Sequence, residues 1–165
     1  MTTSTASPAF SEAALAEYRE LLARYPERRA ALMPTLWLAQ REFGWLSLPV
    51  QEYVAELMEL PLAWVSSVVS FYTMYWKEQK GRWHLQVCRN LSCQLRGAAD
   101  VQRALEGRLG ICDGERTADG RFSLEEVECL ASCDTAPVLQ VNNTEYHENL
   151  TVERTLALIE RLASE

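Results

Sequence analysis

The sequence has little that would support several common enzyme chemistries or a membrane span. It contains no GxGxxG motif, and residues 11–76 hold no Ser-His-Asp arrangement, no HExxH and no phosphate-binding loop. These motifs are typical of dinucleotide-binding sites, serine hydrolases, zinc proteases and nucleotide-binding sites, in that order, so none of these sites is expected here. No apolar run approaches the roughly 18–20 residues that a membrane-spanning helix needs. Direct membrane insertion is therefore not expected.

Positive charge is also scarce. The 16 Lys and Arg residues against 23 Asp and Glu residues give a formal net charge of -7. Affinity for nucleic acid depends on clustered Lys and Arg, so nucleic acid is not an expected partner. The N-terminal segment MTTSTASPAFSEAALAEYRE has no early basic residue and no apolar signal core, which favours a cytoplasmic location.

Four of the five cysteines form two closely spaced pairs. Cys88 and Cys93 lie in VCRNLSCQLRG with C-x4-C spacing, and Cys129 and Cys133 lie in VECLASCDTAPV with C-x3-C spacing. An odd number of cysteines without a secretion signal does not indicate a disulfide framework. Four thiolates in two pairs are what a tetrahedrally coordinated metal centre requires.

The spacing of the pairs leaves the metal open. Zinc sites most often use C-x2-C, with spacings up to four residues allowed, and neither pair is C-x2-C. C-x4-C occurs in plant-type two-iron ferredoxins, but the C-x2-C that follows it there is missing. Thiol–disulfide exchange also favours C-x2-C. Spacing favours an iron–sulfur cluster and keeps structural zinc, redox thiols and unliganded cysteines as alternatives.

The sequence of the N-terminal half predicts a disordered tail over residues 1–10 and a helical domain over residues 11–79. Helix starts are expected near Ser11, Pro26, Ser47 and Pro61, with a kink or restart at Pro34. Segment 62–76 is very apolar and predicts a buried helix that runs into an extended stretch. The aromatic side chains of Phe71–Trp76 fit core packing, or an exposed anchor for a partner protein.

Residues 80–165 predict an α/β domain with the order β-α-β-β-β-α. The expected strands cover 83–87, 122–128, 137–142 and 145–147, and the expected helices cover 94–108 and a segment from Thr151. Leu95 is expected to share one face of the first helix with Ala98, Val101, Ala104 and Leu105. Both cysteine pairs fall where strands end, and Cys93 falls near the start of helix 94–108, where the helix dipole favours an anionic centre.

The two cysteine motifs resemble the thioredoxin-like [2Fe–2S] ferredoxin family. The resemblance extends upstream through YPERRAALMPTLWLAQREFGWLS and VVSFYTMY, and so covers nearly the whole chain. It implies a helical domain followed by a thioredoxin-like domain. It also implies that one [2Fe–2S] cluster is held by four ligands, Cys88, Cys93, Cys129 and Cys133. Cys112 matches no ligand position and is expected to be a small buried hydrophobe.

The branch of the family that the chain resembles includes the small [2Fe–2S] subunits of NADH–quinone oxidoreductase, respiratory complex I. The resemblance therefore implies an electron-transfer subunit without a complete active site of its own. It implies an F-type partner subunit that holds FMN and binds NADH, other peripheral-arm subunits, and a peripheral position on the inner face of the bacterial plasma membrane. The N-terminal helices and the aromatic run are expected to dock the partner.

Two alternatives to this function remain open. One is the equivalent small subunit of an NAD-linked hydrogenase or formate dehydrogenase. The other is a zinc-stabilised interaction module.

The charged residues beside the cysteines could tune such a cluster, which carries about -2 when oxidised and about -3 when reduced. Arg89 and Arg96 are expected to ease reduction. Glu126, Glu128 and Asp134 are expected to oppose it if they point toward the cluster. The alternative is that these side chains are solvated and point away.

Overall fold

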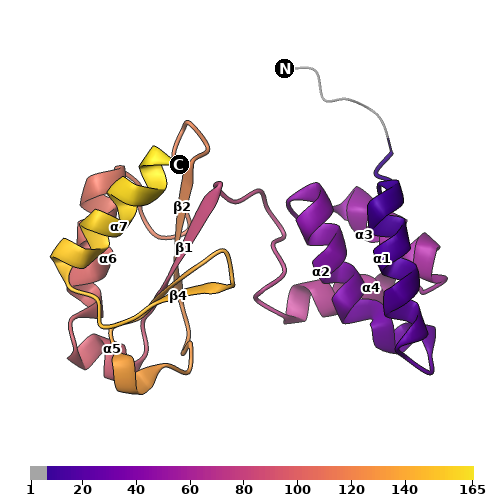
Figure 1. Ribbon diagram of the computed structural model, residues 1–165, viewed down its shortest axis with the longest axis horizontal. Helices are drawn as coiled ribbons and strands as arrows, with labels where there is room; N and C mark the ends of the chain where they lie inside the picture. The colour runs from indigo at the N-terminus through magenta and orange to yellow at the C-terminus, as the bar shows by residue number, and fades with distance from the viewer. Residues whose placement is uncertain (1–6) are drawn as a thin grey trace. The chain divides into compact units, whose positions relative to one another are not determined.

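The computed structural model describes residues 7–165. They form two compact units, one ending at Gln79 and the other spanning Lys80–Glu165 (Figure 1). Residues 1–6 of the expected tail lie outside the described range. The last tail residue, Phe10, is buried and stacks on Phe43 with a centroid distance of 5.6 Å. No helix of residues 7–165 is long and apolar enough to cross a membrane.

The first unit consists of four α-helices and one short 3-10 helix (Figure 1). These are α1 (Glu12–Ala23), η1 (Arg28–Ala31), α2 (Leu32–Phe43), α3 (Leu48–Met58) and α4 (Leu62–Phe71). The Ser11 hydroxyl caps α1 by accepting a hydrogen bond from the Ala14 N–H at 3.2 Å. The restart expected at Pro34 occurs two residues earlier, at Leu32. Pro34 therefore lies in the first turn of α2, where its missing N–H breaks no helical hydrogen bond.

Helix α4 is less buried than its apolar sequence predicts. Only Val65 and Val69 are buried, whereas Trp64 is 40% exposed and Phe71 is 77% exposed. The backbone becomes extended at Tyr72. Tyr75 then enters the core, and its hydroxyl donates to the Met33 carbonyl at 2.9 Å. The aromatic run therefore has both kinds of environment, since Tyr75 packs inside and Phe71 faces solvent.

The second unit is a four-stranded mixed sheet with helices, in the expected order β-α-β-β-β-α. The strands are β1 (Trp83–Cys88), β2 (Phe122–Val127), β3 (Leu139–Val141) and β4 (Glu145–His147). They are arranged β2-β1-β3-β4, with β1 parallel to β2 and the other neighbours antiparallel. The helices are α5 (Leu91–Leu95), α6 (Ala98–Leu109) and α7 (Val152–Ser164), and a 3-10 helix, η2 (Cys133–Thr135), precedes β3.

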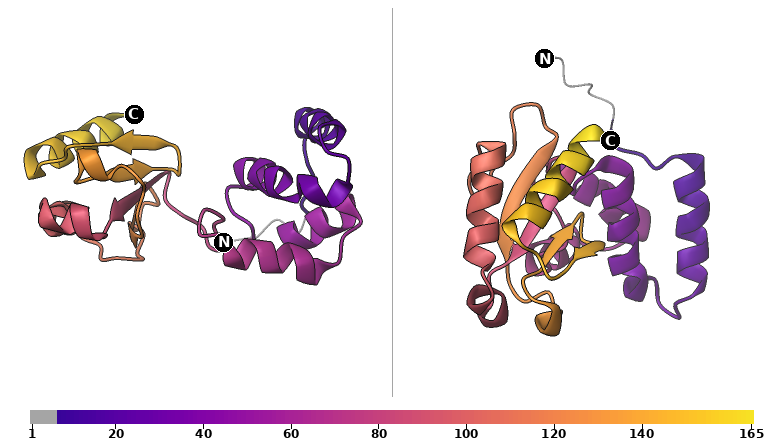
Figure 2. Two further views of the ribbon diagram at one scale, coloured as in Figure 1. Left: turned by 90° about the horizontal axis from the view of Figure 1, so that it is seen from below. Right: turned by 60° about the vertical axis from the view of Figure 1, so that its left-hand side comes forward.

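One face of this sheet forms the main core of the unit. Helices α6 and α7 pack against each other (Figure 1; Figure 2). Their apolar side chains pack against alternate residues of the strands. This core includes Leu85, Leu124 and Leu139 from the sheet and Leu105 and Ile159 from the helices. Burying each of these side chains stabilises the fold by about 2 kcal/mol. This core fixes the direction in which β1 and β2 deliver the cysteine motifs.

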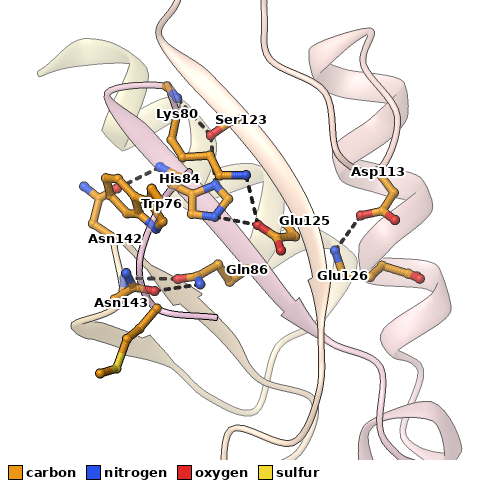
Figure 3. Close-up of polar contacts among 12 residues, drawn as sticks. Trp76, Lys80, His84, Gln86, Asp113, Ser123, Glu125, Glu126, Asn142 and Asn143 are labelled. Carbon is orange, nitrogen blue, oxygen red and sulfur yellow. Dashed lines mark hydrogen bonds and ion pairs between the residues drawn. The ribbon is translucent and has the colours of Figure 1, made fainter. Parts of the chain in front are cut away.

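The opposite face of the sheet carries buried polar side chains (Figure 3). His84 on β1 is completely buried, and its Nδ1 lies 2.8 Å from the Ser123 hydroxyl oxygen on β2. Its Nε2 lies 3.1 Å from Oε2 of Glu125, and Lys80 Nζ lies 3.2 Å from the same oxygen. Hydrogen bonding to His84, aided by the nearby Lys80 charge, lowers the pKa of Glu125 to about 2. The network ties β1 to β2.

Gly81 allows the close backbone approach that this joint, the polar network between β1 and β2, requires. A Cβ atom at Gly81 would lie 2.4 Å from the Phe122 carbonyl carbon, so only glycine fits this close approach. The Gly81 N–H donates to the Ser123 hydroxyl at 2.9 Å.

Candidate iron–sulfur site

The first cysteine pair is buried. Cys88 is the last residue of β1 and Cys93 lies in α5, and each is 2% exposed. They form a small apolar cluster with Ala98, Ala136 and Val138. The Cys88 N–H donates to the Val138 carbonyl at 3.1 Å, which extends the pairing of β1 beyond β3. This apolar packing and the backbone hydrogen bond hold both thiols in place.

Burial and the neighbouring thiol both affect the Cys93 side chain. Burial is the main cause that raises the pKa of Cys93 to about 11, and a hydrogen bond with the Cys88 thiol raises it further. A backbone hydrogen bond from Val138 acts in the opposite direction. A bound cation would reverse this preference for the protonated form, because metal coordination deprotonates a thiol.

The second cysteine pair is exposed. Cys129 follows β2 and Cys133 begins η2, and their sulfur atoms lie 3.5 Å apart. Ala131 has a positive φ of 62°, and its N–H donates to the Cys129 sulfur at 3.3 Å. A hydrogen bond with Cys129 is the first cause that raises the pKa of Cys133, and the charge of Cys129 adds to it.

The two pairs approach each other where α5 contacts η2. The Ser92 hydroxyl on α5 hydrogen-bonds to Cys133, and the Cys88 and Cys93 thiols are close enough to Cys133 to interact with it electrostatically. Among residues 7–165, no group of three or more His, Cys, Asp or Glu side chains is gathered to hold one metal ion. The thiols lie as two pairs, and a two-iron cluster takes one pair of protein ligands on each iron. The donor set therefore fits a [2Fe–2S] cluster.

The expected position of Cys93 at the start of a long helix is wrong. Residues 94–108 do not form one helix, because α5 ends at Leu95 and Gly97, with a φ of 98°, separates it from α6. Cys93 lies inside α5, so the dipole of α6 does not begin at this cysteine. The expected face shared by Leu95, Ala98 and Val101 is also wrong, because the break leaves Leu95 78% exposed while the other two side chains are buried.

The Arg89 and Glu128 side chains pair with each other beside the cysteines. Arg89 Nη2 lies 2.6 Å from Oε1 of Glu128, and Asn90 Nδ2 lies 3.4 Å from its Oε2. The hydrogen bond between the two side chains lowers the pKa of Glu128 and raises the pKa of Arg89. The expected opposite effects of these two residues on a cluster are therefore combined in one ion pair.

Cys112 is exposed, and the expectation that it is a buried hydrophobe is wrong. Ile111 takes the buried position after α6 instead. The Cys112 N–H donates to the Glu115 carboxylate at 2.7 Å, at the start of a polar turn.

Sequence reasoning missed the group of Ser123, His84 and Glu125, in which Ser123 and His84 are buried and Glu125 is half-buried. Its residue types match those of a hydrolytic triad, but Ser123 is only 3% exposed and its hydroxyl accepts the Gly81 N–H. A nucleophilic serine must reach its substrate, so we interpret this group as a structural joint. The sequence carries no local signal for this group, because the register that sets His84 opposite Ser123 is decided by strand pairing.

The family comparison agrees with the fold. Residues 18–163 match the family model for the thioredoxin-like [2Fe–2S] ferredoxin. The chain belongs to this family.

Curated relatives cover most of the chain, and each is named as a subunit of NADH-quinone oxidoreductase. The relative from Rhizobium meliloti is 47% identical over 144 residues, with 87% of this chain and 85% of the relative aligned. The relative from Rickettsia bellii is 40% identical over the full length of both chains. The relative from Thermus thermophilus is 46% identical over 85% of this chain and 78% of its own length.

A solved structure supports the fold alone. A chain of an NAD+-reducing [NiFe]-hydrogenase in the H2-reduced state superposes with a TM-score of 0.72 at 23% identity. The match covers 81% of this chain but only 22% of the hydrogenase chain. The chain thus spans about a fifth of the hydrogenase chain that it matches.

Proposed function

We propose that this chain is an electron-transfer subunit of an NADH–quinone oxidoreductase that holds one [2Fe–2S] cluster on Cys88, Cys93, Cys129 and Cys133. A partner subunit that oxidises NADH at FMN would exchange single electrons with this site. The observation that carries the proposal is the 40–47% identity to subunits of this complex over most of both chains. The pairing of the four thiols supports it.

The chain contributes position and electrostatics to this function. When bound, the cluster supplies one-electron chemistry. The buried pair fixes one side of the site on β1 and α5, and the exposed pair leaves the other side open to a partner. The Ala131 N–H points a dipole at the Cys129 sulfur, which favours negative charge there.

Two alternatives are less well supported. The likeness to the hydrogenase has only 23% identity and carries the fold alone, whereas the identity to quinone-reductase subunits is 40–47%. A zinc module would place four ligands around one ion. The family model that matches residues 18–163 instead describes a [2Fe–2S] ferredoxin.

Electron paramagnetic resonance tests the proposal on anaerobically purified, dithionite-reduced protein, with iron, zinc and sulfide assayed on the same sample. We expect a low-temperature S = 1/2 signal and about two irons and two sulfides per chain. A colourless protein without this signal and with one zinc would overturn electron transfer. The Cys112→Ser variant is the matched control, because it removes a thiol outside the four proposed ligands.

A further inference from the structure

The helical unit contains a cavity of about 390 Å³ that the proposed cluster does not use. One wall comes from η1 and the start of α2, with Arg29, Leu32 and Met33. The other wall comes from α4, with Trp64 and Val68. Its volume lies within the range of common ligand pockets, roughly 300–1,000 Å³. Most of its lining is uncharged, so an apolar side chain would fit into it.

Among residues 7–165, Arg29 is the one ionisable residue that lines this cavity. Its guanidinium carbon lies 3.6 Å from the centre of the Trp64 ring, which is a cation–π contact. No carboxylate of residues 7–165 pairs with Arg29, whereas the neighbouring Arg28 pairs with Glu59 at 2.8 Å. The stacking holds the guanidinium plane in one orientation and leaves its N–H edges available to an acceptor.

The surface beside the cavity has the composition of a protein interface. Trp64, Ser67, Val68 and Phe71 are spaced to share one face of α4, and Phe71 is 77% exposed. Exposed tryptophan, phenylalanine and arginine are enriched at interfaces, and tryptophan and arginine supply much of their binding energy. Arg29 is itself exposed at the edge of this apolar cavity, so its positive charge is complementary to a carboxylate on a partner.

We infer that this cavity receives a segment of a neighbouring subunit in which a large apolar side chain lies next to a carboxylate. The apolar side chain fills the cavity between α2 and α4, and the carboxylate accepts hydrogen bonds from Arg29. Because Arg29 is already stacked on Trp64, little side-chain freedom is lost on binding. The inference rests on the proposed function only in that the partner belongs to the same complex.

Photo-crosslinking of the assembled complex identifies the occupant. With p-benzoylphenylalanine in place of Ser67, which lines the cavity, we expect one intersubunit cross-link. Its peptide should carry Asp or Glu within a few residues of an apolar side chain. The same probe at Glu20, an exposed residue of α1, is the control and should not give this product. A lack of intersubunit product at Ser67, or a cross-linked segment without an acidic residue, overturns the inference.

Charge reversal tests the role of Arg29. Calorimetry between the full chain and the cross-linked subunit should show about tenfold or greater weakening for Arg29→Glu. Reversing the partner's carboxylate to lysine should recover most of the loss. Arg19→Glu makes the same charge change on α1, where Arg19 is exposed, and should have a much smaller effect. Equal losses for the two variants, or no recovery, would refute the pairing.

The cluster assay separates the two proposals. If Arg29→Glu protein shows the S = 1/2 signal and normal affinity, the docking inference fails and the electron-transfer proposal stands. If neither the wild type nor the variant holds a cluster but Arg29→Glu still weakens association, the docking inference stands and the electron-transfer proposal fails.

Discussion

The two cysteine pairs occupy very different surroundings. Cys88 and Cys93 are each 2% exposed and belong to an apolar cluster at the end of β1. Cys129 and Cys133 are exposed on the segment between β2 and β3. The comparison indicates a site in which one cysteine pair is fixed by packing and the other is open to solvent. The buried pair determines where a cluster would be held, and the exposed pair determines how solvent and a partner reach it.

The largest expected effect comes from removing one proposed ligand of either pair. Cys88→Ser and Cys129→Ser should both lose most of the iron and the S = 1/2 signal, since a [2Fe–2S] cluster needs four ligands. The comparison predicts a difference in the free energy of unfolding of the cluster-free proteins. Cys88→Ser buries a hydroxyl and should cost about 1–2 kcal/mol, whereas Cys129→Ser should cost little. Retention of two irons by Cys129→Ser would contradict the ligand assignment.

Thiol reactivity should separate the pairs in the cluster-free protein. With a pKa of about 11 against an ordinary value of 9.0, Cys93 should react with iodoacetamide at pH 8 on the order of a hundredfold more slowly than an exposed thiol of ordinary pKa. Cys129 and Cys133 should be modified first. Time-resolved mass spectrometry measures the order, and Cys112 serves as an exposed internal reference. Modification of Cys93 before Cys129 would contradict the burial difference.

The joint between β1 and β2 supports both pairs, because these strands lead to Cys88 and to Cys129. The depressed pKa of Glu125 means that its stabilisation is complete above about pH 4.5 and is lost as the pH falls toward about 2. Glu125→Gln should therefore lower the free energy of unfolding at pH 7 by about 1–2 kcal/mol, after allowance for solvent screening. Chemical denaturation between pH 2 and pH 7 measures this. Glu126→Gln, on the same strand, is the control. A wild-type loss of stability between pH 4.5 and pH 2 that persists in Glu125→Gln would assign it to another group.

The smallest expected effect concerns the ion pair between the two cysteine segments. Arg89→Gln should make the cluster harder to reduce and Glu128→Gln should make it easier. Each shift should be on the order of 20 mV, because exposed charges are strongly screened. The double variant should lie near the wild type, since it removes both charges together. Potentiometric titration at low salt measures the shifts. Shifts of the same sign for both single variants would show that the pair acts through structure instead of charge.

Local sequence signals predicted much of the fold. Helix starts at Ser11 and before Pro49 and the strand that ends at Cys88 follow from caps, proline positions and residue alternation. The continuous helix over 94–108 was wrong because apolar spacing carried it through Gly97, where the backbone turns left-handed. The exposure of Cys112 was also missed, because spacing does not tell which of two adjacent apolar residues, Ile111 or Cys112, takes the buried position.

The sequence by itself determined the order of elements, the two cysteine pairs and the family resemblance, because each of these depends on neighbours along the chain. The tertiary structure alone decided that one pair is buried and the other exposed. It also brought Arg29 onto Trp64 and His84 beside Ser123. These contacts join residues far apart in sequence. They are set by strand register and helix packing, which minimise the exposed apolar area of the whole unit and leave no local signature.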